Sequence, residues 1–255
     1  MGKIIAIANQ KGGVGKTTTA VNLAAALGLR KKKVLLIDVD QQGNATSALG
    51  ASKRDSESTS YELIMGGKKA EEIIKQTEYT NVSLVTSSRS LVGAELELAE
   101  IEGRAYMLKS ALAELRGLYD FILIDCPPAL GLITINALTA ADTVLIPLQC
   151  EFFALEGISQ VSDTINRVKR TSNPQLGIEG VLMTMFDSRL NLTHQVAAEV
   201  EKYYPRQIFK TVIPRTVRLS EASSYGQPIA YFDKRSKGAK AYEDLAKEII
   251  KKNKG

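Results

Sequence analysis

A glycine-rich turn near the start of the chain combines the residue types that can hold a polyphosphate. Glycine lets the main chain approach phosphate oxygens, the Lys16 ammonium can reach the β- and γ-phosphates, and the Thr17 hydroxyl can ligate Mg²⁺. An apolar run over residues 4–8 precedes the turn and a helical pattern over 20–29 follows it, so helix N–H groups would face the ligand. We therefore predict that a nucleotide binds to the turn, which reads Lys11, Gly12, Gly13, Val14, Gly15, Lys16, Thr17 and Thr18.

Two further apolar stretches end in carboxylates. Asp38 and Asp40 close the first stretch and, being two residues apart, point to the same side of a strand. Asp125 closes the second. In a nucleotide site one carboxylate can hold Mg²⁺ or its waters while another orients the attacking water. We therefore predict that Mg²⁺ is held by Thr17, Asp38 and Asp125.

Strand-like and helix-like segments alternate along the chain. Repeated β–α units with short loops predict a mainly parallel sheet with helices on both faces, in one α/β domain over residues 1–255. The polar, lysine-rich stretch 50–80 is predicted to be a surface excursion with short helical pieces at 60–65 and 70–75. Further strands are predicted at 81–85, 142–147, 177–183 and 208–213, and helices at 91–102, 105–118, 154–169, 193–203 and 239–252.

The net charge of +5 is unevenly distributed. Residues 201–255 contain 13 Lys and Arg against 6 Asp and Glu, a net charge of +7, whereas residues 1–200 have a net charge of −2. The excess favours an anionic partner for the C-terminal fifth of the chain. Ordinary surface lysines would give the same count, so composition alone leaves both interpretations open.

Composition argues against several other classes of protein. Two cysteines, Cys126 and Cys150, and a single histidine, His194, cannot build a four-ligand zinc site. The sequence has neither a signal-peptide pattern nor an uninterrupted apolar run of membrane-spanning length. We expect a cytoplasmic globular protein whose cysteines are small buried side chains.

The glycine-rich turn departs from the strict P-loop pattern, because Gln10 stands where that pattern has glycine. A second lysine, Lys11, occurs in the turn instead, and this variant resembles the deviant Walker A motif of the ParA/MinD family of ATPases. The resemblance implies a P-loop NTPase-like domain that binds ATP or ADP with Mg²⁺ and hydrolyses ATP. It also implies a sandwich dimer, in which Lys11 reaches the partner's nucleotide and a small Gly12 lets the two loops approach.

Later parts of the chain resemble chromosomal ParA proteins of the Soj type. The resemblance implies a partition ATPase whose ATP-bound homodimer binds double-stranded DNA without sequence preference and is therefore nucleoid-associated. A ParB-type partner would stimulate hydrolysis and release. The segments that carry this resemblance are 124–128, 134–138, 149–151, 154–157 and 211–215.

The family resemblance also implies roles in catalysis. Lys11 and Lys16 act on the phosphates, Asp40 positions the hydrolytic water, and Asp125 is the Walker B carboxylate. Gln41 replaces the proline that usually follows the second aspartate, so the turn is less preorganised.

Two pairs of binding residues are implied in the same way. Arg189 and Arg218 fall where Soj-like proteins carry DNA-contacting arginines. The adenine is expected near Met185 and Pro214.

Three rival functions remain open at this point. A MinD-like ATPase that binds the membrane surface would need a C-terminal helix with bulky apolar residues, whereas residues 246–255 have no aromatic side chain and a short apolar face, so no stable membrane association is expected. A bacterial tyrosine kinase of this branch would need a C-terminal tyrosine cluster, but Tyr242 is isolated. A scaffold that binds nucleotide without turnover would not need Asp40 and Asp125.

Overall fold

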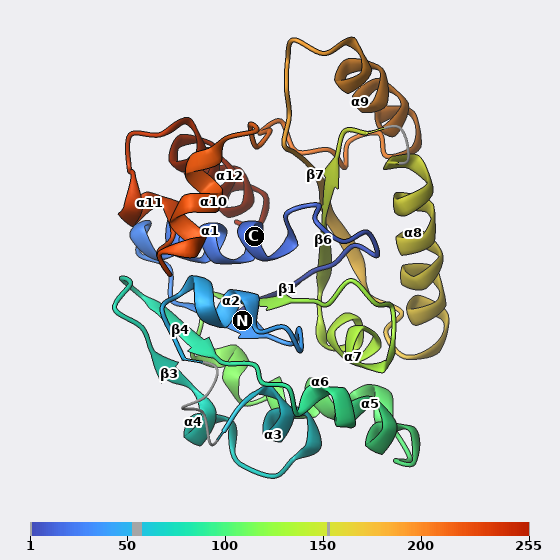
Figure 1. The fold of residues 1–255 in the computed structure, drawn as a ribbon. Helices are drawn as coiled ribbons and strands as arrows, with labels where there is room; N and C mark the ends of the chain where they lie inside the picture. Colours follow the sequence, from blue (N-terminus) through green and yellow to red (C-terminus); the bar gives the residue numbers. More distant parts are fainter. Residues whose placement is uncertain (1, 53–57, 152–153, 255) are drawn as a thin grey trace.

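A seven-stranded β-sheet forms the centre of the molecule (Figure 1). The computed structural model describes residues 2–52, 58–151 and 154–254. The strand order is β3-β4-β2-β5-β1-β6-β7, and every pair is parallel except β3 with β4. The predicted mainly parallel α/β fold is confirmed. The strands are β1 (Lys3–Ile7), β2 (Val34–Asp38), β3 (Lys75–Gln76), β4 (Val82–Val85), β5 (Phe121–Asp125), β6 (Thr143–Gln149) and β7 (Gly177–Thr184).

Helices cover both faces of the sheet, as predicted. Figure 1 shows α1, α10, α11 and α12 on one side and α3, α5, α6, α7 and α8 on the other. In the described parts of the chain the helices are α1 (Lys16–Leu29), α2 (Asn44–Ala48), α3 (Ser60–Met65), α4 (Ala70–Ile73), α5 (Leu91–Ala99), α6 (Met107–Leu112), α7 (Leu132–Ala140), α8 (Ala154–Thr171), α9 (Asn191–Tyr203), α10 (Val217–Ser224), α11 (Ile229–Phe232) and α12 (Lys237–Lys252), with 3₁₀ turns η1 (Arg104–Tyr106) and η2 (Leu115–Gly117).

Every strand except β3 contributes to two apolar cores, because successive side chains of a strand point to opposite faces. On β1, Ile4 and Ala6 belong to the core that includes α3 and α5 to α8. Ile5 and Ile7 belong to the core that includes α1, α10 and α12. The central strands are therefore apolar on both sides, which explains their nearly continuous hydrophobic sequences.

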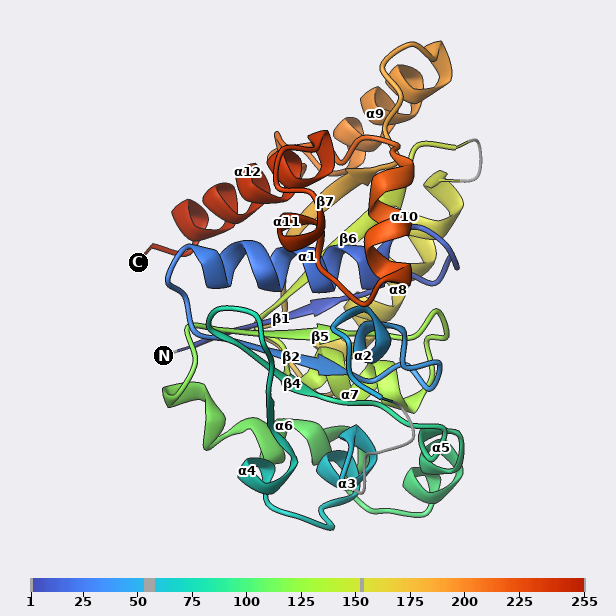
Figure 2. The ribbon, with the colours of Figure 1, turned by 60° about the vertical axis from the view of Figure 1, so that its left-hand side comes forward.

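The parallel register brings the predicted chemical residues to one edge of the sheet. Asp125 at the end of β5 is level with Ile7 on β1 and with Asp38 on β2. The glycine-rich turn leaves β1 at the same edge. Figure 2 shows that α2 and α10 also lie at this end of the sheet. The carboxyl edge of a parallel sheet is where open α/β folds bind their ligands.

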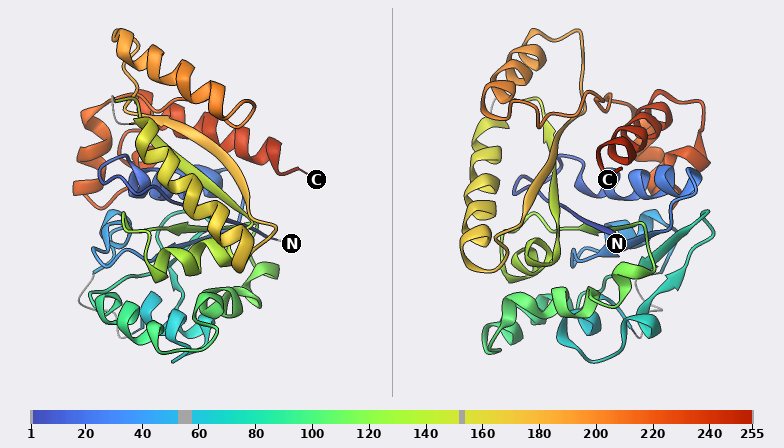
Figure 3. Two further views of the ribbon diagram at one scale, coloured as in Figure 1. Left: turned by 90° about the vertical axis from the view of Figure 1, so that its right-hand side faces the viewer. Right: turned by 180° about the vertical axis from the view of Figure 1, so that it is seen from behind.

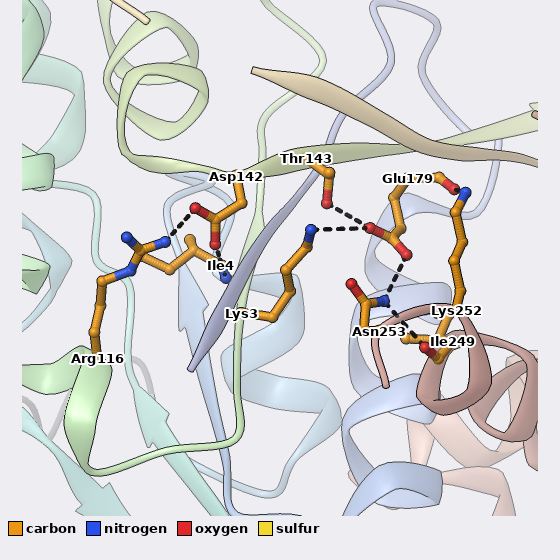
Figure 4. Close-up of polar contacts among 9 residues, drawn as sticks. All are labelled: Lys3, Ile4, Arg116, Asp142, Thr143, Glu179, Ile249, Lys252 and Asn253. Atoms are coloured by element: carbon orange, nitrogen blue, oxygen red, sulfur yellow. Dashed lines mark hydrogen bonds and ion pairs between the residues drawn. The ribbon is translucent and has the colours of Figure 1, made fainter. Parts of the chain in front are cut away.

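Near the opposite edge a buried carboxylate, Glu179, ties the last helix to the sheet (Figure 4). It accepts hydrogen bonds from the Thr143 hydroxyl at 2.6 Å and from the Asn253 amide at 2.8 Å, and the Lys3 ammonium lies 3.7 Å away. The Lys252 ammonium donates to the Glu179 carbonyl oxygen. Figure 3 (right) shows α12, in red, next to α1, in blue, with which it is in contact. Helix α12 is thus held along its length and at its end.

The predicted final strand at 208–213 is wrong. Only Ile208 and Pro214 form single bridges, to Val181 and Phe186. Between them the N–H groups of residues 210 and 211 donate instead to the carboxylate of Glu248 on α12, at 2.8 and 3.1 Å. The segment runs alongside β7, but its middle residues do not pair with that strand.

The predicted helix at 105–118 is also wrong in its continuity. It is divided into η1, α6 and η2, because the backbone tightens to three-residue hydrogen bonds on both sides of α6. Its predicted core role is confirmed, since Leu108, Leu112 and Leu115 are fully buried. Residues 53–57 of the predicted surface excursion lie outside the described residues.

Candidate nucleotide-binding site

The glycine-rich turn is shaped as a cradle at the start of α1. Gly13 and Gly15 have φ of 74° and 87°, in the left-handed region that favours glycine. Helix α1 begins immediately afterwards, at Lys16, so its free N–H groups face the turn. The Lys16 ammonium donates a 3.1 Å hydrogen bond to the Lys11 carbonyl oxygen and so lies over the loop. Burial lowers the pKa of Lys16, and the charge of Asp125 opposes that shift.

In the described part of the chain, Asp125 lacks the hydrogen-bond partners that a buried carboxylate usually has. Its side chain is fully buried, and neither carboxylate oxygen has a hydrogen-bond partner within the described residues. Burial and the neighbouring Asp38 raise the pKa of Asp125 well above its usual value, while the nearby Thr17 hydroxyl and Lys16 ammonium oppose the shift. An unpartnered buried carboxylate is costly, so a cation beside it would be strongly favoured.

The donor set around Asp125 suits Mg²⁺ better than a metal held by protein alone. No group of three or more His, Cys, Asp or Glu side chains in the described part of the chain could hold a metal ion. Mg²⁺ commonly uses one or two protein oxygens and completes its shell with phosphate and water. The Asp125 carboxylate and the Thr17 hydroxyl fit that requirement.

Asp38 and Asp40 organise the segment that follows β2. Asp38 accepts hydrogen bonds from the Asp40 N–H at 3.2 Å and from both the N–H and the hydroxyl of Thr46 at 2.7 Å. Burial raises the pKa of Asp38 to about 6 against these hydrogen bonds. Asp40 accepts from the Gln42 N–H at 2.9 Å. Both oxygens of Asp38 are therefore engaged with α2 and the turn before it, and its role as a Mg²⁺ ligand stays a prediction.

Lys11 is held by a residue that sequence reasoning missed. Its ammonium forms a 2.8 Å ion pair with Glu151, whose other oxygen accepts from the Gln149 amide at 2.5 Å. The Lys11 N–H donates to the Asn9 side chain at 3.1 Å. The sequence does contain a signal for this pair. Glu151 follows β6, and β6 is the neighbour of β1, from which the turn with Lys11 leaves.

A pocket of about 320 Å³ opens beside the turn, and both predicted adenine residues, Met185 and Pro214, line it. It begins at Gly15 and Thr18, and the Thr184 hydroxyl joins it to the turn by donating to the Val14 carbonyl oxygen at 2.8 Å. Sequence reasoning missed Thr184. A larger groove of about 520 Å³ lies between α8 and α9, and none of the predicted site residues lines it.

The two predicted DNA-binding arginines are exposed and paired with carboxylates of their own chain. Arg189 forms two hydrogen bonds with Asp187, at 2.9 and 2.7 Å, which lower the pKa of Asp187 to about 2. Arg218 donates to Glu221 at 2.7 Å and to Asp233 at 3.0 Å. Arg218 lies between Val217 and Leu219, which line the 320 Å³ pocket, and Arg189 follows Met185, another lining residue, by four positions.

A glycine cradle at a helix start, a lysine over it and an unpartnered carboxylate on the adjacent strand define a P-loop nucleotide-binding protein. The comparisons with known proteins agree with that class. A family model described as an AAA domain matches residues 2–178. The sporulation initiation inhibitor protein Soj of Bacillus subtilis is 55% identical, with 98% of each chain covered. The chromosome partitioning protein ParA of Myxococcus xanthus is 50% identical over 99% of this chain and 89% of its own. The chain therefore belongs to the ParA/Soj family of chromosome-partitioning ATPases.

Solved structures show the same fold. A cobyrinic acid a,c-diamide synthase from Mycobacterium smegmatis, with bound ADP and magnesium, has a TM-score of 0.87 at 37% identity, with 98% of this chain and 95% of that chain covered. The septum site-determining protein MinD of Pyrococcus horikoshii, complexed with Mg-ADP, has a TM-score of 0.82 at 28% identity, with 100% and 98% covered.

Proposed function

We propose that this protein is a Mg²⁺-dependent ATPase that dimerises on binding ATP, binds DNA without sequence preference and acts in chromosome or plasmid segregation. The observation that carries the proposal is the buried, unpartnered Asp125 carboxylate beside Lys16 and Thr17. Mg²⁺ bound with a nucleotide would neutralise it. Magnesium also supplies charge stabilisation at the transferred phosphate. ADP and magnesium are bound in the related structures.

Each residue of the site then has a role. The turn from Gly12 to Thr18 holds the phosphates, Lys16 neutralises their charge, and Thr17 and Asp125 hold Mg²⁺. Asp40 orients the attacking water. We propose that Met185 and Pro214 enclose the adenine, because they line the pocket next to the turn.

Dimerisation is supported by two features of the turn. A Cβ added to Gly12 would meet nothing within 4 Å, so packing within one subunit does not require glycine there. Close approach of a second subunit would require it. Lys11, which pairs with the half-exposed Glu151, can exchange this surface ion pair for a phosphate at small cost.

DNA is the proposed partner of the exposed arginines. Arg189 and Arg218 can bind phosphates without reading sequence, and the net charge of +7 in residues 201–255 adds to that attraction. A ParB-type protein is the proposed stimulator of hydrolysis, by analogy with the partitioning relatives. We place the protein in the cytoplasm, on the nucleoid.

The membrane-binding alternative is disfavoured by α12. Its apolar residues Tyr242, Leu245, Ala246 and Ile249 are buried against the body of the protein, so they are not available to a lipid surface. In the described part of the chain no helix is long and apolar enough to cross a membrane.

Sedimentation with plasmid DNA tests the proposal. With ATP and Mg²⁺ the protein should self-associate and co-sediment with DNA, and with ADP it should do neither. Lys11→Ala should bind ATP and remain monomeric. Self-association of that variant equal to the unmodified protein would refute the sandwich dimer.

A further inference from the structure

Helix α10, which carries Arg218, contacts the nucleotide site at both of its ends. At its first turn, Val217, Leu219 and Ser220 line the proposed base pocket. Just beyond its last turn, Gly226 abuts Gly50, two residues after α2. Figure 2 shows α10 beside α2, and the two helices are in contact. We propose that α10 couples the bound nucleotide to the DNA-binding surface within one subunit, an inference that rests on the proposed function.

The segment that follows α10 meets the end of α2 through main-chain atoms. A Cβ added to Gly226 would lie 3.1 Å from both the Gly50 Cα and the Ser47 carbonyl oxygen. The Tyr79 hydroxyl donates a 2.8 Å hydrogen bond to the Gly226 carbonyl oxygen and fixes this junction from the side. Because no flexible side chain separates the two backbones, a displacement of α2 must move the end of α10.

Helix α2 is in turn held by the phosphate side of the site. Asp38 accepts hydrogen bonds from the N–H and hydroxyl of Thr46, the middle residue of α2. Asp38 and Asp125 are register partners at the ends of the neighbouring strands β2 and β5. A cation placed beside Asp125 therefore changes the charge balance next to the residue that anchors α2.

The N-terminal end of α10 is connected to the base pocket. Most of its lining residues come from two segments, 184–185 and 213–220. The segments are joined by hydrogen bonds from the Phe186 N–H to the Ile213 carbonyl oxygen at 2.9 Å and from the Arg215 N–H to the Phe186 carbonyl oxygen at 3.3 Å. Met185 has a φ of 48°, uncommon for a residue other than glycine. A base in the pocket would press on the segment that leads into α10.

The arginine pairs give the coupling two discrete states. In this structure Arg218 is engaged by Glu221 and Asp233, and Arg189 by Asp187. Binding to DNA requires each guanidinium to exchange carboxylate oxygens for phosphate oxygens. A shift of α10 relative to Asp233, which lies outside that helix, changes the balance between these two arrangements.

Matched glycine variants test the coupling. Gly226→Ala places a Cβ in the α2 contact, whereas Gly66→Ala has a similar φ, 76° against 68°, but nothing within 4 Å. The measured quantity is the DNA affinity with ATP divided by that with ADP. We expect Gly226→Ala to lower this ratio by about fivefold or more, with ATP-dependent self-association retained, and Gly66→Ala to leave it unchanged.

Two further measurements guard against a folding defect. Tyr79→Phe removes only the hydrogen bond to Gly226 and should lower the same ratio in the same direction. Hydrogen exchange of residues 217–224 in the Lys11→Ala variant, measured with ATP, ADP and no nucleotide, needs neither DNA nor a dimer. We expect slower exchange in α10 with nucleotide bound.

The outcomes separate the two proposals. Absence of DNA binding by the unmodified protein with ATP would overturn the proposed function, and with it the coupling, whatever the exchange in α10. Exchange in α10 that ignores nucleotide, or an unchanged affinity ratio in both Gly226→Ala and Tyr79→Phe, would overturn the coupling. Parallel loss of self-association and DNA binding would also overturn it, because dimerisation alone would then explain the nucleotide dependence.

Discussion

The charges of Lys16, Asp38 and Asp125 set the chemistry of the site. All three side chains are nearly or fully buried, and burial shifts each pKa toward the neutral form. Hydrogen bonds from Thr46 offset the burial of Asp38. The Asp125 oxygens have no hydrogen-bond partner within the described residues, and only the nearby Thr17 hydroxyl and Lys16 ammonium oppose its shift. The site thus contains one buried carboxylate that a bound cation would stabilise.

Replacing Asp125 by Asn should stabilise the nucleotide-free protein and abolish stabilisation by Mg²⁺. Removing an unpartnered buried charge is worth about 1–3 kcal/mol. Because the folded-state pKa of Asp125 is raised, the unmodified protein loses stability as pH rises from the unfolded value through the folded one, so the advantage of the variant should grow with pH. Thermal unfolding at several pH values, with and without ATP and Mg²⁺, measures both effects. A less stable nucleotide-free variant would contradict the assignment.

Charge reversal at Arg218 should abolish DNA binding and leave ATP-driven dimerisation intact. Glutamate there would face Glu221 and Asp233 and repel phosphate. Arg167→Glu, an exposed position on α8, is the matched control. A gel-shift titration with ATP gives the affinities, and equal affinity for Arg218→Glu and unmodified protein would rule out the assigned contact.

At the scale of elements, α12 behaves as part of the core. Leu245 is fully buried in the layer shared with α1 and α10, and Glu179 fixes the end of the helix. We therefore expect α12 to act as a structural helix rather than as a membrane anchor.

Leu245→Ala should therefore lower the free energy of unfolding by about 2–5 kcal/mol, because it leaves a cavity in the core. Lys251→Ala, at an exposed position of the same helix, should change it by no more than about 0.5 kcal/mol. Urea denaturation provides both values. A negligible effect of Leu245→Ala, together with ATP-dependent binding to liposomes, would instead favour the membrane alternative.

Sequence patterns predicted elements well where the signal is local. The strands ending at Asp38 and Asp125 are apolar on both faces, and the motif residues are contiguous in the turn. Helix α10 was missed because it is short and polar and buries only Leu219 and Ala222. Helix α7 was missed because it is buried around most of its circumference and shows no amphipathic stripe.

Partners distant in sequence could not be predicted. Apolar residues in 208–213 are typical of a strand, yet Glu248 takes two of the N–H groups. The Lys11–Glu151 pair joins residues 140 positions apart. Cys126 and Cys150 are free and buried, as composition predicted.

For the whole molecule, the proposed DNA contacts predict a steep dependence on salt. A dimer presents two copies each of Arg189 and Arg218, so at least four phosphates would release counterions. With four such contacts, affinity should fall about a hundredfold between about 50 and about 200 mM salt. Fluorescence anisotropy with random-sequence duplexes measures the slope, and the slope should not depend on sequence. A flat salt response would exclude phosphate contacts as the source of affinity.

The segment 207–215 limits how the sheets of two subunits can pair edge to edge. It passes along the rim of β7 and uses the N–H of Val181 and the carbonyl oxygens of Val181 and Met183, which would otherwise be open to a foreign strand. The far rim, β3, is only two residues long and antiparallel. Neither edge strand of the sheet therefore offers a template for pairing with a strand of another molecule. Subunits can then gather at high local concentration on DNA without forming cross-β fibres.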